Sequence, residues 1–167
     1  LFSEETVGIL QTDPASGVCV FEYDKEWIAN GFSLSPTELP LRSGLFFADK
    51  GLFDGNFAVF ENSLPDGYGL YLLDRMLRRQ NSSLKELTPL QRLSIIGTAG
   101  MGAISYLPMM PGFDKQNEVV DMTRLDSIQD EAIKVLSEKE SGDESYLYYN
   151  SANSGGARPK TAIRSRD

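Results

Sequence analysis

The sequence predicts an α+β fold: a small antiparallel sheet with about three packed helices. Two observations support this prediction. Short stretches rich in β-branched and aromatic residues lie near the start of the chain, and stretches with apolar residues at helical spacing follow later. The chain has 167 residues, of which 41% are hydrophobic, so it is long enough to enclose a core.

A β-hairpin is predicted at the start, with strands over 6–11 and 18–23. The residues between them that favour a turn are Asp13, Pro14, Ser16 and Gly17. Further on, Pro36 and Pro40 exclude a long helix over 32–41 and favour a strand interrupted by turns. Residues 45–60 combine glycines with five phenylalanines, which predicts loops over a core.

The first predicted helix follows Asp66, which we expect to cap it. Its apolar positions at helical spacing are Leu70, Leu73, Met76 and Leu77. Asp66 and Asp74 could be read as a catalytic carboxylate pair, but a capping role for Asp66 and a surface or salt-bridge role for Asp74 are favoured.

The second predicted helix begins at Thr88, where Pro89 and Gln91 complete a capping box with proline in the first turn. Leu90, Leu93 and Ile96 then form its buried stripe, and Gly97 ends it. A third helix is predicted over 124–139.

Glycines at 97, 100 and 102 have a spacing that a phosphate-binding loop could use. However, this run closes a helix and enters the strand-like stretch 103–107, whereas a dinucleotide fingerprint follows a strand and opens a helix. A turn is therefore the favoured interpretation. The five phenylalanines of 45–60 could form the binding site of a small-molecule sensor, but packing in the core is the favoured interpretation.

The composition excludes several kinds of function. The chain has no histidine and one cysteine, so zinc sites, Ser-His-Asp triads and Cys-His dyads cannot be assembled within it. Cys19 lies in an apolar run, where we expect a buried thiol. The net charge of −8 argues against nucleic-acid binding. Because neither a signal peptide nor an apolar run of roughly 20 residues is found, we expect a cytoplasmic protein without a membrane segment.

Small residues precede two cations in the segment 150–160. Glycine lets backbone N–H groups approach an anion closely, and arginine or lysine adds charge-assisted hydrogen bonds, so the segment suits phosphate. An ordinary linker has the same composition and stays an alternative. The last ten residues are basic, with Arg158, Lys160, Arg164 and Arg166.

Three blocks of the sequence together resemble the HipA family of bacterial serine/threonine kinases, the toxins of type II toxin–antitoxin modules. The first block is Leu34-Ser35-Pro36 with Leu39-Pro40-Leu41. The second runs over 60–69, with Leu64-Pro65-Asp66-Gly67 at its centre, and continues into Leu72-Leu73-Asp74-Arg75. The third is Ser154-Gly155-Gly156-Ala157-Arg158-Pro159-Lys160, which is similar to the family's glycine-rich loop.

The resemblance implies an N-terminal subdomain over 1–148, followed over 149–167 by the glycine-rich loop and the start of a kinase domain. The residues expected to contact the phosphates of ATP are Gly155, Gly156, Ala157, Arg158, Pro159 and Lys160. The family's autophosphorylated serine falls on Asn153 here, so Ser154 or Ser151 is the candidate for this modification. No residue of the chain is assigned as catalytic or as a metal ligand.

The resemblance further implies a kinase that uses ATP and Mg²⁺ and transfers phosphate to a protein substrate, one linked to translation. A helix-turn-helix antitoxin is the expected neutralising partner. Because the family's catalytic residues lie further along than Asp167, we expect this stretch alone to be inactive. The alternative is a free-standing interaction module that docks on a kinase or on a DNA-binding antitoxin.

Overall fold

The computed structural model describes residues 1–100, 102–113, 130, 132–135, 137 and 147–148. These residues fall into two compact units. The first comprises Leu1–Leu64 and Leu87–Asp114, and the second comprises Pro65–Glu86 and Lys115–Asp167. The predicted boundary between 148 and 149 stays a prediction, because residues 149–167 lie outside the described part.

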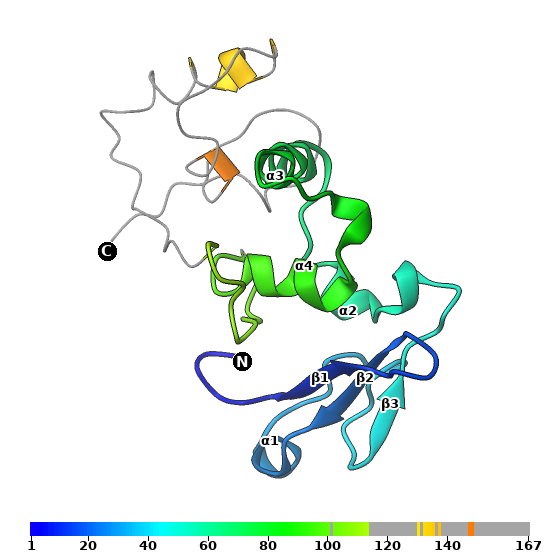
Figure 1. Ribbon diagram of the computed structural model, residues 1–167. Coiled ribbons are helices and arrows are strands. Elements are labelled where there is room, and N and C mark those ends of the chain that lie inside the picture. Colours follow the sequence, from blue (N-terminus) through cyan, green and yellow to red (C-terminus); the bar gives the residue numbers. More distant parts are fainter. Residues whose placement is uncertain (101, 114–129, 131, 136, 138–146, 149–167) are drawn as a thin grey trace, which may run out of the picture. The chain divides into compact units, whose positions relative to one another are not determined.

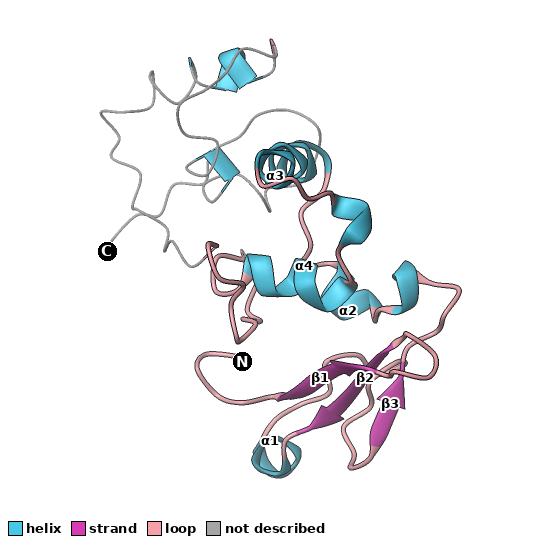
Figure 2. Cartoon of the chain, viewed as in Figure 1, coloured by secondary structure: helices cyan, strands magenta, loops and turns pink. Residues whose placement is uncertain are grey.

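A three-stranded antiparallel sheet forms the β part of the first unit (Figure 2). Its strands are β1 (Gly8–Thr12), β2 (Cys19–Tyr23) and β3 (Leu45–Phe47), with β2 in the centre. Asp13 and Gly17 close the β1–β2 turn, where the Gly17 N–H donates to the Asp13 carbonyl at 2.8 Å and Gly17 adopts φ +78°. Glycine adopts this left-handed conformation without steric cost, so the turn confirms the predicted hairpin.

Hydrogen bonding alternates along β1. The Asp24 N–H donates to the Val7 carbonyl and the Asp13 N–H to the Val18 carbonyl, both at 2.9 Å. With the register Ile9↔Glu22 and Gln11↔Val20, this alternation makes Ile9 and Gln11 the residues that bond to β2. The backbone groups of the residues between them, Gly8, Leu10 and Thr12, point to the open edge of the sheet.

Short helices complete the first unit: α1 (Lys25–Asn30), η1 (Phe53–Gly55), α2 (Ala58–Glu61) and α4 (Pro89–Ile96) (Figure 1). The start of α4 confirms the predicted capping box, since the Thr88 side chain accepts from the Gln91 N–H and the Gln91 side chain accepts from the Thr88 N–H. Gly97 ends α4 with φ +53°, as predicted. Leu93 and Ile96 are buried, whereas Leu90 is only partly buried.

One face of the sheet carries the core of the first unit. The buried residues of this core are Val7, Val18, Cys19, Phe21, Tyr23, Trp27, Leu39, Phe46, Ala48, Phe57, Phe60 and Leu93. Phe21 lies at its centre, with its ring centroid 4.8 Å from that of Tyr23 and 5.4 Å from that of Phe60. Such edge-on and tilted aromatic pairs add to the stabilisation that burial provides.

Two expectations for this region are wrong. Residues 32–41 form no strand, but only an isolated bridge between Ser35 and Leu39. The third strand lies instead at Leu45–Phe47, inside the stretch expected to be loops. The glycine run that begins at Gly97 is a turn, as expected, while 103–107 contributes only a bridge from Ile104 to Phe2.

The second unit contains α3 (Gly67–Arg79) and η2 (Leu84–Glu86). The buried side of α3 consists of Tyr68, Gly69, Leu72, Leu73, Met76 and Leu77. Leu70, which belongs to the predicted buried stripe, is 40% exposed. The buried side of α3 is therefore shifted by one residue around the helix relative to the predicted stripe. Residues 130 and 132–135 are helical, which agrees with the described part of the third predicted helix.

Candidate functional site

The predicted phosphate-contacting residues, Gly155, Gly156, Ala157, Arg158, Pro159 and Lys160, lie outside the described residues. The same holds for the candidate autophosphorylation sites Ser151 and Ser154, and for Asn153. The structure therefore leaves the glycine-rich loop untested, and it stays a prediction from the sequence.

The first sequence block has a structural role that the fold makes clear. Leu39 is fully buried, and its carbonyl accepts from the hydroxyls of Tyr23 at 2.6 Å and Ser33 at 2.8 Å. The Tyr23 hydroxyl in turn accepts from the Leu34 N–H at 2.9 Å. Because a buried carbonyl without a partner is costly, these bonds fix the irregular 33–39 segment against the sheet.

The second block leads into α3. Asp66 occupies the N-cap position, but its side chain makes no capping hydrogen bond, so the expected side-chain cap is wrong. Asp74 pairs with Arg78 at 2.7 Å one helical turn later, which confirms the predicted surface salt bridge. The carboxylate at position 74 is thus part of a helix-surface ion pair, and the block as a whole gives no catalytic arrangement.

The phenylalanines of 45–60 divide into two groups. Phe46, Phe57 and Phe60 are buried in the core, which confirms the favoured interpretation for them. Phe47 and Phe53 are 59% and 46% exposed. The five rings therefore do not enclose one common cavity.

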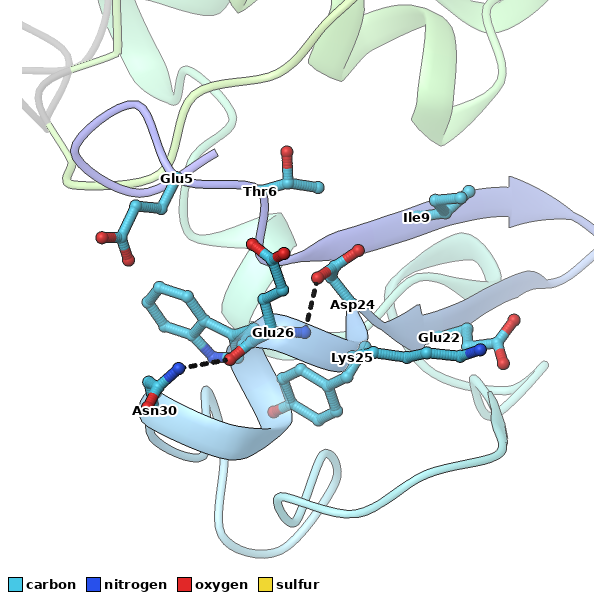
Figure 3. Close-up of a pocket in the computed structure, with 11 residues that line it drawn as sticks. Glu5, Thr6, Ile9, Glu22, Asp24, Lys25, Glu26 and Asn30 are labelled. Atoms are coloured by element: carbon cyan, nitrogen blue, oxygen red, sulfur yellow. Dashed lines mark hydrogen bonds between the residues drawn. The ribbon is translucent and has the colours of Figure 1, made fainter.

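A pocket of about 760 Å³ lies where β1, β2 and α1 meet (Figure 3). Strand β1 contributes Ile9, β2 contributes Glu22 and Tyr23, and the segment before β1 contributes Glu5 and Thr6. The remaining wall comes from α1 and its flanks, through Asp24, Lys25, Glu26, Trp27, Asn30 and Gly31. We call this cavity the acidic pocket, because four of its side chains are carboxylates and one is an ammonium group.

The short helix α1 is what positions this wall. Asp24 caps it by accepting the Glu26 N–H at 2.8 Å, and the cap is drawn in Figure 3. Trp27 is buried on its inner side, where the indole N–H donates to the Phe32 carbonyl at 3.0 Å. The Trp27 ring also contacts Phe2 and Phe32 edge-on, with centroids 5.7 and 5.1 Å away. The aromatic wall of the pocket is therefore held rigidly.

Three of the four carboxylates at the pocket are available to a ligand. Asp24 is engaged as a cap, whereas the side chains of Glu5, Glu22 and Glu26 have no hydrogen-bond or ion-pair partner within the described part of the chain. An exposed row of carboxylates attracts cations and repels phosphate. The acidic pocket is thus suited to a basic group and unsuited to the phosphates of ATP.

A second pocket, of about 350 Å³, lies between β1 and α4 and is mostly apolar. Leu10, Leu90, Leu93 and Ile104 are among its lining residues, and Tyr106 is the titratable side chain there. Burial raises the pKa of Tyr106 to about 12, and its hydroxyl lies 2.6 Å from that of Ser63. This phenol therefore stays protonated and serves packing rather than chemistry.

Cys19 is buried, as the sequence predicts, and burial raises the pKa of its thiol to about 11. A thiol with so high a pKa is a poor nucleophile. Across the described ranges, no group of three or more histidine, cysteine, aspartate or glutamate side chains could hold a metal ion. None of the helices in those ranges has the length and apolar character needed to cross a membrane.

Sequence reasoning missed the acidic pocket. Its residues come from positions 5–31, which the sequence divides between a hairpin and an unassigned segment, and α1 has only one buried residue, Trp27. A usable signal was present in the alternation of Val20, Phe21, Glu22 and Tyr23, which places Glu22 on the face opposite Phe21 and Tyr23.

In a comparison with known protein families, residues 1–107 match the model of the HipA N-terminal domain. The match includes the first two sequence blocks and ends before the third. Comparison with curated proteins and with solved structures found no match. Since the matched residues make up more than half of the chain, the chain belongs to the HipA N-terminal domain family, as the N-terminal region of a HipA-type protein.

Proposed function

We propose that this chain is the N-terminal part of a HipA-type serine/threonine protein kinase. The observation that carries the proposal is the family match over residues 1–107. The resemblance of 154–160 to a glycine-rich phosphate loop supports it from the sequence alone. In the proposed reaction a substrate hydroxyl oxygen bonds to the γ-phosphorus of ATP, the bond to ADP breaks, and the hydroxyl proton passes to a base.

Within this proposal the two parts of the chain have different tasks. The folded first unit is a docking and support domain, because none of the buried titratable groups that the structure describes in it is placed for phosphoryl transfer. The segment from Gly155 to Lys160 contacts the phosphates, with Mg²⁺ and the catalytic base supplied by a kinase domain. Ser154 or Ser151 is the proposed site of autophosphorylation. A cytoplasmic helix-turn-helix antitoxin is the proposed inhibitory partner.

The test compares phosphoryl transfer from radiolabelled ATP by the protein encoded by the whole reading frame and by residues 1–167 alone. We expect transfer by the former and none by the latter. In the former, Gly155→Val with Gly156→Val should abolish ATP binding, because branched side chains block the approach of backbone N–H groups to phosphate. Gly102→Ala is the matched control, since the space around Gly102 is open.

Strong transfer by residues 1–167 alone would contradict the proposed division of tasks. Unchanged ATP binding by the double valine variant would remove the glycine-rich loop from the proposal. Failure of the whole protein to bind ATP at all would contradict the kinase assignment itself.

A second function is favoured by a different observation, the exposed apolar side chains of the sheet, Ile9, Leu45 and Phe47. Such a surface suits an interaction module that docks on a kinase or an antitoxin without transferring phosphate itself. The whole reading frame distinguishes the kinase from the interaction module. If no magnesium-binding and base residues accompany this domain in one polypeptide, the interaction module is the better assignment.

A further inference from the structure

The sheet has a second face that does not contribute to the core. We call it the outer sheet face, and the register fixes its members in two rows across the strands. One row is Ile9, Glu22 and Leu45, and the next is Gln11, Val20 and Phe47. Because side chains alternate along a strand, all six project to the side opposite Phe21.

The outer sheet face is apolar where a solvated face is normally polar. Ile9 is 66% exposed, Phe47 59% and Leu45 48%, while Val20, in the middle of the second row, is buried. Antiparallel sheets that leave one face in water usually place polar side chains there. Three large exposed apolar side chains on neighbouring strands therefore mark a contact surface.

The same face carries negative charge. Glu22 stands between Ile9 and Leu45 in its row, and both Ile9 and Glu22 also line the acidic pocket. The outer sheet face and the acidic pocket are thus one continuous surface, with Glu5 and Glu26 at its rim (Figure 3). The carboxylates of Glu5, Glu22 and Glu26 have no hydrogen-bond or ion-pair partner among the described residues. Lys25 is the single cation that lines the pocket, against four carboxylates, so a docked cation would meet a net negative charge.

From this combination we propose that the outer sheet face and the acidic pocket bind a cationic amphipathic helix of another protein. Its apolar side covers Ile9, Leu45 and Phe47, and its lysine or arginine side chains reach Glu22 and the pocket rim. Packing of a helix against the face of a sheet is one of the common layer arrangements of proteins. The proposal does not depend on phosphoryl transfer.

Charge complementarity selects this occupant over the alternatives. An anionic membrane surface or a nucleic acid would be repelled by the carboxylates. A second copy of the chain is disfavoured because each copy carries a net charge of −8. A cationic helix alone satisfies both the apolar and the acidic parts of the surface.

The experiment titrates the full chain with a short fluorescent peptide that has leucine at helical spacing and lysine elsewhere, read by fluorescence anisotropy. We expect saturable binding that weakens as salt rises. Two control peptides of equal length test the charged and the apolar contributions to binding separately: one replaces lysine with glutamate, and the other replaces leucine with serine. Each should bind roughly tenfold more weakly or worse, because it lacks one half of the complementarity.

Variants of the chain locate the site. Phe47→Ser should weaken binding roughly tenfold, whereas Leu70→Ser, which removes an exposed leucine of α3, should not. Glu22→Gln should weaken binding about threefold and reduce its salt dependence. Asp130→Asn removes the same charge from an exposed helical position and should change neither. Circular dichroism verifies that each variant is folded.

Two results would overturn the proposal. One is binding of the lysine–leucine peptide that is equal in Phe47→Ser, Glu22→Gln and the unaltered chain, or absent altogether. The other is a dimer of the chain, detected by sedimentation, that Phe47→Ser dissociates, since a second copy would then be the occupant.

Discussion

The Tyr23 hydroxyl joins strand β2 to the 33–39 segment through one buried oxygen, since it donates to the Leu39 carbonyl and accepts from the Leu34 N–H. Tyr23→Phe should lower the free energy of unfolding by about 1 to 3 kcal/mol, because the Leu34 N–H is left without its partner. Ser33→Ala is the comparison, and it should cost about 1 kcal/mol or less because the Leu39 carbonyl keeps the Tyr23 bond. Urea unfolding measures both, and equal costs would contradict the assigned role.

The buried thiol of Cys19 makes stability depend on alkaline pH. Its pKa rises from 9.0 to about 11 on folding, so above pH 9 the unfolded chain loses this proton first. The unfolded state then binds fewer protons than the folded state, and stability falls as pH rises from 9 to 11. Cys19→Ala should remove the part of this fall that lies below about pH 10. Burial also raises the pKa values of Tyr23, Tyr68 and Tyr106, but from an ordinary value of 10.0, so these phenols weaken the fold only above that pH.

Thermal unfolding at several pH values measures this dependence. An identical decline in Cys19→Ala and in the unaltered chain would show that the thiol is not its source. Reaction with a thiol reagent gives an independent reading, since the thiol should react slowly in the folded chain and rapidly in urea.

Among the elements, α4 depends on its first turn. Thr88→Ala removes the hydroxyl that accepts the Gln91 N–H, and should destabilise the chain by about 1 kcal/mol. Thr88→Ser keeps the hydroxyl and is the matched control, which should be close to neutral. The difference between the urea midpoints of the two variants measures the cap itself, and a midpoint for Thr88→Ala equal to that of Thr88→Ser would contradict this role.

Strand β1 contains a glycine with no room for a side chain. A Cβ at Gly8 would clash with the Glu22 carbonyl and lie 2.7 Å from the Phe21 ring. Gly8→Ala should therefore disturb the β1–β2 pairing and cost about 1 to 3 kcal/mol. Gly102→Ala is the control, because nothing lies within 4 Å of its Cβ position. If both variants unfold at the same urea concentration, the close contact at Gly8 does not limit stability.

The elements that the sequence predicted correctly are those whose signals are local. The hairpin turn, the Thr88 capping box and the Gly97 stop each depend on residues within a few positions of one another. Helix α1 was missed because six residues with one buried side chain show no periodicity. Strand β3 was missed because three residues are too few for a pattern, and the 32–41 segment is held by the distant Tyr23 hydroxyl rather than by a ladder.

For the candidate site, too, some parts could be predicted from the sequence and others could not. The acidic pocket could not be predicted, since it exists only after β1, β2 and α1 are brought together. The family was recognised from the sequence because short blocks persist in order along the chain, and the match over 1–107 confirms it. The phosphate loop at Gly155 and Gly156 stays a prediction from composition and resemblance.

For the whole molecule, the central position of β2 predicts the pattern of hydrogen exchange. Amides of Val20 and Phe21 bond to strands on opposite sides and are buried, so they should exchange among the slowest. In β1, Ile9 and Gln11 should be protected, whereas Leu10 at the open edge should exchange faster than either. Amide-resolved exchange by NMR tests this alternation, and uniform protection along β1 would show that its edge is covered.

The single tryptophan of the chain, Trp27, forms one wall of the acidic pocket and packs edge-on against Phe2 and Phe32. A change at that wall alters the surroundings of the indole. The protein thus carries its own optical reporter: ultraviolet emission, without any attached dye, follows both the filling of the pocket and the loosening of the amino-terminal aromatic cluster.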